Sequence, residues 1–322
     1  MSYRLSLEFA RVTENAAIAA ARWMGKGKRD EADKSAVDIM RQMLGELDID
    51  GQIVIGEGER DKAPMLYIGE KVGNGGVAVD IAVDPVEGTN LVANGLPNGI
   101  SVLAVAERGS LLHAPDTYMR KLAVGPKAKG NVHIDAPVRD NLKAVAESLD
   151  RAVTDLTVII LDRPRHKDLI EEVRQTGARI QLISDGDTDA AIATAIAGTG
   201  IHCLMGIGGA PEGVLAAAAI KCLGGEFQGK LVPRNEQEEE RCRRMGHGDR
   251  NKVYAIEDLV KGEDVVFVAT GITPGDLLKG VRFFGDGART HTIIVDSKTS
   301  TIRFIESIYR LTKRPLFVRR DG

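Results

Sequence analysis

The sequence predicts an α/β protein of two domains. Its 322 residues exceed the roughly 100–200 residues of a typical single domain. Amphipathic helices alternate with short apolar strands along most of the chain, and this alternation becomes regular in the second half. We therefore expect an α+β domain at residues 1–145 and an α/β domain at residues 146–322, joined by a helix and loop near residues 135–155.

Three helices are expected in the first half. Apolar residues recur at helical spacing over residues 5–23, which predicts an amphipathic helix. A second helix follows a polar link, with Asp30 as its N-cap and Asp33 in its first turn. Pro64 suits the first turn of a helix, so residues 63–72 are expected to form the third.

Short apolar runs bounded by glycines predict the strands of the first half. Residues 99–116 resemble two strands joined by a turn at Arg108-Gly109, so this sheet should contain antiparallel pairs. The strands are expected at residues 51–59, 77–84, 99–107 and 110–116.

Strand and helix alternate from residue 156 to residue 225, which favours a parallel sheet flanked by helices. The charged segment at residues 235–246 places Glu and Arg at helical spacing, and we interpret it as a solvated helix without a catalytic role. Strands are expected at residues 156–162, 178–187, 201–209, 264–273, 291–298 and 301–310, and helices at residues 167–177, 188–198 and 214–225.

Composition and charge exclude several classes of protein. The net charge of −3 argues against a nucleic-acid-binding protein, which usually presents a strongly basic face. Charged residues interrupt the amino-terminal segment where a signal peptide needs an apolar run, and the run "GVLAAAAI" is too short for a bilayer, which takes about 20 residues. The three cysteines lack CxxC spacing and favour neither a disulfide framework nor a zinc site. We therefore expect a cytoplasmic protein with no membrane or nucleic-acid partner.

The segment "VAVDIAVDPVEGTN" threads acids through an apolar strand. Asp80 and Asp84 share one face, because side chains alternate along a strand. Pro85 cannot donate a hydrogen bond to a sheet, so the strand is expected to end there and Glu87 to lie on a turn. A buried carboxylate is costly unless it is paired or bound to a metal.

Gly88 and Thr89 complete this segment. Glycine lets a ligand approach the main-chain amides, and threonine adds a hydroxyl. Carboxylates, amides and a hydroxyl at one strand end suit Mg²⁺ or Mn²⁺ together with a substrate phosphate. The alternative is a turn in which the acids only accept hydrogen bonds from nearby amides.

Further acids accompany glycines or helix starts. Glu57 lies between two glycines, and Asp33 and Glu212 lie in first helical turns, where the helix dipole favours a carboxylate. Each of these acids has an alternative interpretation, as part of a polar turn or as an acid that stabilises a helix start. For Glu59, which follows Gly58, we prefer the polar turn. A dinucleotide fingerprint is not satisfied, because Pro211 occupies the third glycine position. Taken together, the acids suit a site in which two metal ions activate water against a phosphate.

Six motifs resemble those of the lithium-sensitive, metal-dependent sugar phosphatases and, among these, the bacterial class II fructose-1,6-bisphosphatases of the GlpX type. They are "VIGEGE", "APMLYIGEKVG", "DPVEGT", "HAPDTYM", "DGD" and "GIGGAPEG". The resemblance runs essentially from end to end. Ile81 and Glu87 stand where the broader superfamily often has Trp and Asp, which points to this class. The resemblance implies a layered fold of alternating helix and sheet layers.

The same resemblance implies roles for individual residues. The expected catalytic residues are Thr89, Asp33 and Glu57, with Thr89 orienting the attacking water; Asp33 is alternatively a hydrogen-bond partner of Thr89. The expected metal ligands are Asp33, Glu57, Asp84, Glu87 and Glu212. The expected substrate contacts are Glu87, Gly88, Thr89, Tyr118, Arg163, Pro164, Arg165, Asp185, Gly186, Asp187 and Gly209.

Two of these residues have a physical reason of their own. Arg163 and Arg165 follow a strand, at the edge where open α/β sheets bind ligands. A guanidinium bonds a phosphate through two parallel N–H groups, so these arginines suit a second phosphate. Their alternative is a pair of surface charges at a strand end.

The expected reaction is hydrolysis of the 1-phosphate of fructose 1,6-bisphosphate to fructose 6-phosphate and phosphate, as in gluconeogenesis, by in-line attack of a metal-bound water. The expected cofactors are two or more Mn²⁺ or Mg²⁺ ions per site, and the expected assembly is a homo-oligomer, either dimer or tetramer. Sedoheptulose-1,7-bisphosphatase or dual activity is the alternative within this chemistry. A catalytically idle, sugar-phosphate-binding regulatory subunit is the alternative of another class. For Asp80 we expect either a hydrogen bond that supports a metal ligand or an ion pair with Lys or Arg.

Overall fold

The computed structural model describes residues 3–58 and 65–311, which form two compact units. The first unit contains the described residues up to Arg108 and from Asp264 onward, and the second is Gly109–Glu263. This division differs from the predicted boundary after residue 145, which falls inside a helix of the second unit. The reason is that the carboxyl-terminal strands return to pair with the sheet of the first half.

The first unit is a mixed sheet with helices on one face. Its sheet has the order β2-β1-β3-β4-β10-β12-β13, and β11 pairs with the far end of β12. β1 and β3 are parallel, whereas the other neighbours are antiparallel. The elements are α1 (Tyr3–Ala21), α2 (Arg29–Gly45), β1 (Ile49–Ile55), β2 (Lys71–Val72), β3 (Val77–Glu87), α3 (Thr89–Asn94), β4 (Ile100–Glu107), β10 (Val265–Gly271), β11 (Arg282–Phe284), β12 (Gly287–Asp296) and β13 (Thr301–Arg310).

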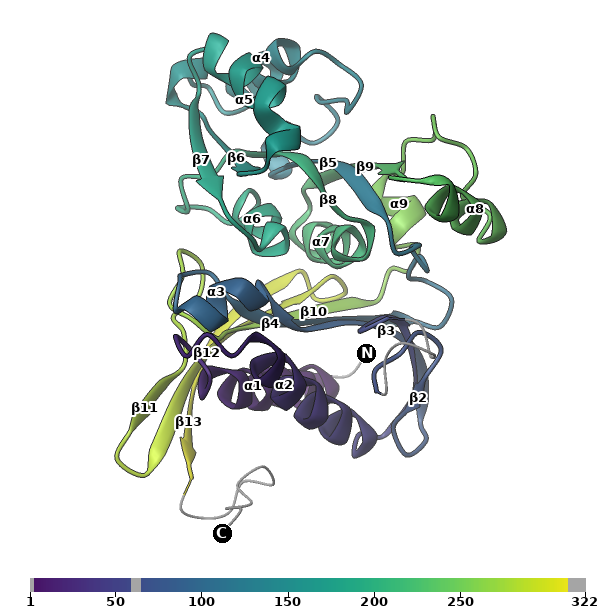
Figure 1. Cartoon of the computed structure of the whole chain (residues 1–322), viewed down its shortest axis with the longest axis vertical. Coiled ribbons are helices and arrows are strands. Elements are labelled where there is room, and N and C mark those ends of the chain that lie inside the picture. The colour runs from purple at the N-terminus through teal and green to yellow at the C-terminus, as the bar shows by residue number, and fades with distance from the viewer. Residues whose placement is uncertain (1–2, 59–64, 312–322) are drawn as a thin grey trace. The chain divides into compact units, whose positions relative to one another are not determined.

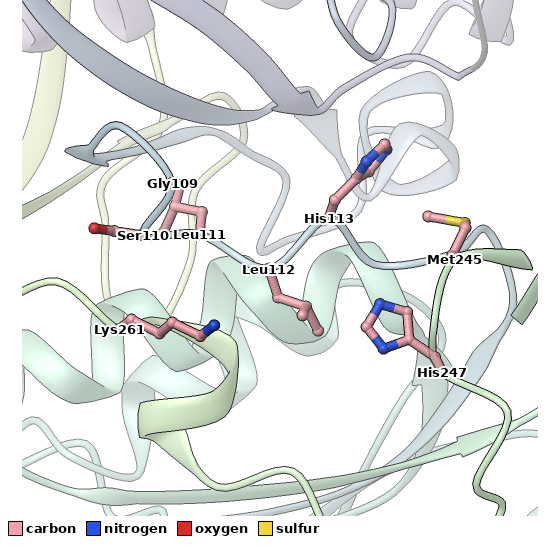
Figure 2. A pocket seen from close by; sticks show the side chains of 8 residues that line it. All are labelled: Gly109, Ser110, Leu111, Leu112, His113, Met245, His247 and Lys261. Carbon is pink, nitrogen blue, oxygen red and sulfur yellow. The ribbon is translucent and has the colours of Figure 1, made fainter. Parts of the chain in front are cut away.

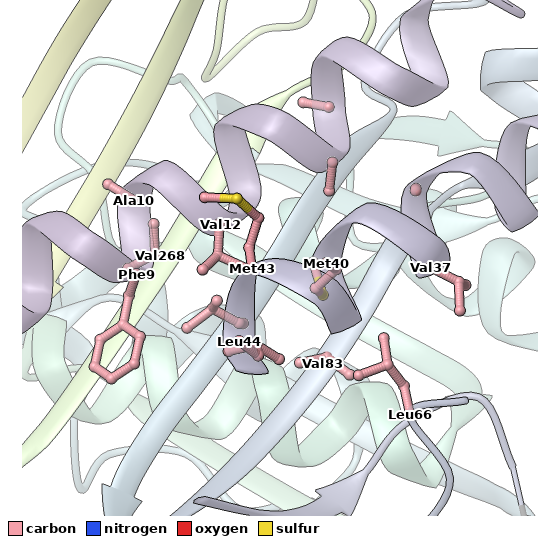
Figure 3. Close-up of a cluster of buried hydrophobic side chains, with 14 of the residues drawn as sticks. Phe9, Ala10, Val12, Val37, Met40, Met43, Leu44, Leu66, Val83 and Val268 are labelled. Carbon is pink, nitrogen blue, oxygen red and sulfur yellow. The ribbon is translucent and has the colours of Figure 1, made fainter. Parts of the chain in front are cut away.

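Helices α1 and α2 lie side by side along one face of this sheet (Figure 1). Along β3, the alternate residues Val79, Ile81 and Val83 are buried toward them, as the twofold periodicity of a strand requires. Figure 3 shows how side chains from both helices and the sheet meet in one apolar cluster, among them Phe9, Val12, Met40, Leu44, Val83 and Val268. Burial of this cluster is the main favourable term in folding of the unit.

The second unit is a five-stranded sheet of order β7-β6-β8-β5-β9. β6 is parallel to β7 and β8, and β5 is antiparallel to β8 and β9. Helices α4 and α5 cover one face and α6 and α7 the other (Figure 1). The elements are β5 (Tyr118–Val124), α4 (Val138–Ser148), β6 (Thr157–Leu161), α5 (Lys167–Gln175), β7 (Arg179–Ile183), α6 (Asp187–Ala193), β8 (Cys203–Gly209), α7 (Ala210–Leu223), β9 (Glu226–Val232), α8 (Glu236–Arg244) and α9 (Ile256–Leu259), with 3₁₀ turns at Pro126–Ala128, Val153–Asp155 and Pro164–His166.

The predicted α/β class is confirmed, and four local predictions are wrong. β3 runs through Pro85 to Glu87, because a bulge between Asp84 and Glu87 takes the proline out of the ladder with β4. Residues 65–72 form turns and the short β2 instead of a helix, and Pro64 lies outside the described residues. Residues 110–116 carry a single bridge at Leu111 and no strand, because the chain enters the second unit there. α2 begins at Arg29, so Asp30 lies inside its first turn and does not cap it.

The described helices include none that is both long and apolar enough to span a bilayer.

Asp80 lies on the sheet face opposite α1 and α2 and is only 2% exposed. Arg108, the last residue of the first unit before the chain leaves it, places its Nε 3.4 Å from Asp80 Oδ1. The same guanidinium donates to the carbonyl oxygens of Val79 and Asp50 and to Gln52 Oε1. The expected ion pair of Asp80 is therefore confirmed, and it ties the ends of β1, β3 and β4 together.

Glu14 of α1 is a second buried acid of the first unit, at 3% exposure. Its carboxylate accepts hydrogen bonds from Thr292 of β12 and from Ser307 and Tyr309 of β13. Thr292 continues through Thr270 to Thr13, with Oγ1–Oγ1 separations of 2.9 and 2.8 Å. This carboxylate is therefore held by hydroxyl groups, and the network fastens β13 to the first helix.

Replacement of Arg108 by methionine should destabilise the first unit. The change leaves the buried Asp80 carboxylate without its cation, which costs about 2–3 kcal/mol once the partial exposure of Arg108 is allowed for. Urea unfolding should show this loss, and Asp80→Asn in the same chain should restore at least half of it. Lys143→Met, which breaks an exposed ion pair with Glu147 on α4, is the matched control and should change stability by less than about 0.5 kcal/mol. Equal effects of the Arg108 and Lys143 substitutions would contradict the role given to the pair.

Candidate functional site

Glu57 lies in a tight loop that follows β1. Its N–H donates to the carbonyl oxygen of Leu66 at 3.1 Å. A Cβ at Gly56 would stand 2.0 Å from that same oxygen, so only glycine permits the two chain segments to approach. The buried carboxylate of Glu70 holds the opposite segment by accepting from the Leu66 N–H, and Arg41 of α2 pairs with Glu70 at 3.0 Å. The position of Glu57 is thus set by neighbouring backbone and by α2.

The side chains of Asp33 on α2 and Glu57 are hydrogen-bonded to each other. Burial, and then the adjacent Asp33 charge, raises the pKa of Glu57 to about 8. Burial also raises the pKa of Asp33, with Arg29 opposing this and Asp30 adding to it. Two carboxyl groups in such contact share a proton at neutral pH. A divalent cation bound between them would replace that proton and relieve their repulsion.

The remaining acids of the first unit lie at the end of β3. Asp84 Oδ1 accepts a hydrogen bond from the Val86 N–H at 3.0 Å, and Glu87 is 4% exposed. β1 and β3 are parallel neighbours in which Ile55 stands opposite Ala82. Glu57 and Asp84 therefore each lie two residues beyond one pairing point, at the same edge of the sheet.

Gly88 and Thr89 form the turn into α3. Gly88 has φ = 80°, in the left-handed region that favours glycine. Thr89 begins α3, and its Oγ1 donates to the Val86 carbonyl oxygen at 3.1 Å. The alternative pairing of Thr89 with Asp33 thus has a competitor for the hydroxyl proton.

The predicted metal ligands do not form a complete metal site among the described residues. Among residues 3–58 and 65–311, no group of three or more His, Cys, Asp or Glu side chains stands in a geometry that could hold a metal ion. Within the predicted set, Asp33 and Glu57 are hydrogen-bonded to each other. Glu212 belongs to the second unit, and Glu59 lies outside the described residues.

In the second unit a buried ion pair organises the residues predicted to contact substrate. Lys121 of β5 places its Nζ 2.7 Å from Asp187 Oδ2 at the start of α6, and both side chains are buried. A Cβ at Gly208 would stand 1.9 Å from Asp187 Oδ2 and 3.0 Å from Lys121 Nζ, so this glycine makes room for the pair. Burial raises the pKa of nearby Glu212, while the Lys121 charge lowers it and Asp187 raises it.

Tyr118, the first residue of β5, has two arginine guanidinium groups against its ring. The Arg165 guanidinium carbon is 4.7 Å from the centre of the Tyr118 ring, and that of Arg234 is 4.4 Å away. Arg165 also donates from Nε and Nη2 to the Ile207 carbonyl oxygen, at 3.1 and 2.6 Å. These bonds use two of its five N–H donors. Glu238 anchors Arg234, and its hydrogen bonds overcome the opposing effect of burial and lower the pKa of Glu238 to about 2.

The other predicted contacts lie on the turns that follow β6, β7 and β8. Arg163 donates to the carbonyl oxygen of Asp162 at 3.1 Å. Gly186 has φ = 84° and precedes α6. Gly209 precedes α7, and a Cβ there would stand 1.9 Å from Glu212 Oε2. The remaining members of this set are Pro164, which begins a 3₁₀ turn, and Asp185, which follows β7.

Two residues of this region were missed by the sequence analysis. Lys121 is the one basic residue at a buried position of β5, and a lysine is fully buried only when it is paired. Its place beside the apolar run Leu122–Val124 was a usable signal, although the sequence gives no way to choose Asp187 as partner. Arg234 carried no comparable signal, because its stacking on Tyr118 depends on the pairing of β5 with β9.

A cavity of about 220 Å³ lies elsewhere in the second unit (Figure 2). Its lining comes from the segment Gly109–His113, from Met245 and His247, and from Lys261. None of these residues belongs to the predicted site. The predicted substrate contacts of this unit therefore do not line this cavity.

Known proteins resemble the chain over nearly its whole length. The family described as bacterial fructose-1,6-bisphosphatase, glpX-encoded, matches residues 3–309. A protein of a Synechococcus species named D-fructose 1,6-bisphosphatase class 2/sedoheptulose 1,7-bisphosphatase is 52% identical, with 96% of each chain covered. Proteins with the same name from Trichodesmium erythraeum and Gloeobacter violaceus are each 51% identical, covering 95% and 97% of this chain and 96% and 97% of their own.

The Asp33–Glu57 pair should make the metal-free protein less stable as pH rises. The folded-state pKa of Glu57 is about 8 and its ordinary value is 4.5, so the folded state binds more protons between these values and loses stability as pH increases through them. Chelator-treated wild type should lose about 3 kcal/mol relative to Glu57→Gln between pH 5 and pH 8. Urea unfolding of both proteins across this range measures the difference and cancels titrations that they share. Parallel stability curves would contradict the shared proton.

Proposed function

This chain belongs to the family of bacterial, glpX-encoded fructose-1,6-bisphosphatases, and from that premise we propose how its residues divide the reaction. The protein is a phosphatase that hydrolyses fructose 1,6-bisphosphate, and its family is metal-dependent. The observation that carries the proposal is the pair of half-buried carboxyl groups at Asp33 and Glu57, which have each other as neighbours where a cation would satisfy both.

We assign the cation ligands to Asp33, Glu57, Asp84 and Glu87 of the first unit and to Glu212. Carboxylates are the ligands that Mg²⁺ and Mn²⁺ prefer, and the raised pKa of Glu57 indicates a position that favours replacement of a proton by a metal. When bound, such ions supply charge neutralisation at the phosphate and a more acidic water. Mn²⁺ or Mg²⁺, two or more per site, fits this donor set.

Around the cleaved phosphate, the turn into α3 is assigned to binding and orientation. The amides of Gly88 and Thr89 lie at the positive end of α3, where a phosphate oxygen is favoured. The Thr89 hydroxyl donates its proton to the Val86 carbonyl oxygen, and its oxygen can still accept a hydrogen bond. A water that donates to this oxygen would be held in line with the scissile bond.

The second unit is assigned the sugar and the distal phosphate. Arg165, braced by Tyr118 and by the Ile207 carbonyl oxygen, has three N–H donors left for a phosphate. Asp187, oriented by Lys121, suits a sugar hydroxyl. The further assigned contacts are Arg163, Pro164, Asp185, Gly186 and Gly209.

The same residues would serve a seven-carbon bisphosphate, because the chemistry at the cleaved end is identical. The relatives' names carry both activities, and sedoheptulose 1,7-bisphosphate is therefore the second candidate substrate. The presence of all five predicted acids argues against a catalytically idle regulatory subunit. A cytoplasmic location and a homo-oligomeric state complete the proposal.

Phosphate release from a panel of sugar phosphates tests the assignment. We expect turnover of fructose 1,6-bisphosphate with Mn²⁺ or Mg²⁺ and none in the presence of a chelator. Asp84→Asn should lower kcat/KM at least about 1,000-fold, equivalent to about 4 kcal/mol of transition-state stabilisation, while the melting temperature of the metal-free protein stays unchanged. The control is Glu147→Gln, an exposed acid on α4.

Each outcome of this panel has a consequence. A larger kcat/KM for sedoheptulose 1,7-bisphosphate would make the second candidate the principal substrate. Failure to release phosphate from either bisphosphate, with metal bound, would favour the regulatory subunit. Full activity of Asp84→Asn would remove this residue from the metal site.

Arg165→Ala should raise KM for the bisphosphate about 10- to 100-fold, because a charge-assisted hydrogen bond to the distal phosphate is lost. A small phosphomonoester without a distal phosphate should be hydrolysed with unchanged kinetics. Arg165→Lys should fall between, since it keeps the charge but loses the planar fork. Arg174→Ala on α5 serves as the control. If KM rose equally for both kinds of substrate, Arg165 would not lie at the distal phosphate.

A further inference from the structure

His166 lies where two strands of the second unit separate. β6 and β8 are parallel neighbours, and their last paired residues are Ile159 and Leu204. Both strands continue beyond this pair, β6 to Leu161 and β8 to Gly209. The 3₁₀ turn after β6 ends at His166, whose side chain is buried at 1% exposure. A histidine that is buried so completely needs partners for both ring nitrogens.

The two ring nitrogens of His166 connect the separated strand ends. Nδ1 lies 2.7 Å from the carbonyl oxygen of Leu161, and Nε2 lies 2.7 Å from the main-chain nitrogen of Ile207. A carbonyl oxygen can only accept and a main-chain N–H can only donate. Nδ1 therefore carries the proton, and the lone pair of Nε2 accepts from Ile207. Only the neutral imidazole, in this one tautomer, can make both bonds.

The surroundings favour this neutral form and hold the ring close to β8. Burial lowers the pKa of His166; the bond to Leu161 opposes this effect, and the neighbouring Arg165 charge adds to it. Gly206 of β8 has φ = 150°, and a Cβ there would stand 3.2 Å from His166 Nε2. Glycine at this position therefore lets the strand pass beside the ring.

Ile207 connects His166 to Arg165. The Ile207 N–H donates to the imidazole, and the Ile207 carbonyl oxygen accepts from Nε and Nη2 of Arg165 at 3.1 and 2.6 Å. Only the φ and ψ angles of Ile207 separate these two groups, so a fixed N–H limits the direction of the carbonyl oxygen. The imidazole thereby limits where the guanidinium lies beside the Tyr118 ring.

We propose that His166 is a positioning residue for the distal phosphate, because it holds Ile207 in the orientation that Arg165 needs. This inference rests on the assignment of Arg165 to that phosphate under the proposed function. His166 is buried and both of its nitrogens are engaged, so it acts through Arg165 and makes no contact with the substrate. Its loss should weaken recognition of the distal phosphate more than the chemistry at the cleaved one.

Two amide substitutions separate the two bonds of the ring. His166→Asn places an amide nitrogen near the position of Nδ1 and removes the acceptor of the Ile207 N–H. His166→Gln places an amide oxygen near the position of Nε2 and keeps that acceptor. We expect His166→Asn to raise KM for fructose 1,6-bisphosphate about 3- to 10-fold, as for one lost hydrogen bond, with little change in kcat. His166→Gln should recover most of the wild-type KM. A wild-type KM in His166→Asn would overturn the proposal.

A matched control histidine lies at the opposite end of β6. Nδ1 of His202 accepts from the N–H of Thr157, the first residue of that strand, at 2.9 Å. His202→Gln removes this acceptor and should leave KM unchanged, even where it lowers the melting temperature as much as His166→Asn does. If both variants raised KM equally, the effect would be a general loss of stability, and the proposal would be wrong.

Combination with Arg165→Ala tests whether His166 acts through Arg165. In that background His166→Asn should change KM by less than about twofold, because the group that it positions is absent. If the two single effects multiplied, the role of His166 would be overturned while the distal-phosphate assignment stood. If Arg165→Ala raised KM equally for the bisphosphate and for a small phosphomonoester, that assignment would fail, and the role of His166 with it.

Discussion

A carboxylate removed from water loses several kilocalories per mole of hydration, and the fold must return that stabilisation through a partner. Both units of this chain bury acids, and three of these acids have different kinds of partner. Asp80 has the Arg108 guanidinium, Asp187 has the Lys121 ammonium, and Glu14 has three hydroxyl groups. These pairings connect β3 to the residue after β4, β5 to the start of α6, and α1 to β12 and β13.

Asp33 and Glu57 break this pattern, because each finds another acid. Where Asp80, Asp187 and Glu14 have cations or hydroxyl groups as partners, these two half-buried carboxyl groups lie together. Their raised pKa values show that, without a metal, this arrangement disfavours the charged form of both carboxyl groups. The nature of the partner thus separates the structural acids from the two acids that we propose as metal ligands. The same distinction explains why Asp80, although it shares a strand face with Asp84, has a structural role.

Local pattern predicted most of the helices and strands, together with the positions of the acids, because spacing and turn residues act over short distances. Pro85 shows where this fails: the rule that proline ends a strand is overridden by a bulge that only the pairing with β4 creates. The contact between Asp33 and Glu57 was equally hidden, since it depends on how α2 packs against the loop after β1. Lys121 needed a buried anion, yet nothing in the sequence selects Asp187 over its neighbours. The division into units was mispredicted because no local signal announces that β10 rejoins a sheet begun by β1 and β3.

The interrupted first unit has a consequence for the way the chain is made. Its sheet is complete only when β10, β12 and β13 join β4. The Glu14 carboxylate of α1 likewise gains its hydrogen bonds from Ser307 and Tyr309 only after β13 has been made. The second unit, Gly109–Glu263, is continuous and possesses its own core. During synthesis the inserted unit therefore has all its residues before the surrounding one does, and α1 must remain without its final partners until β13 has been made.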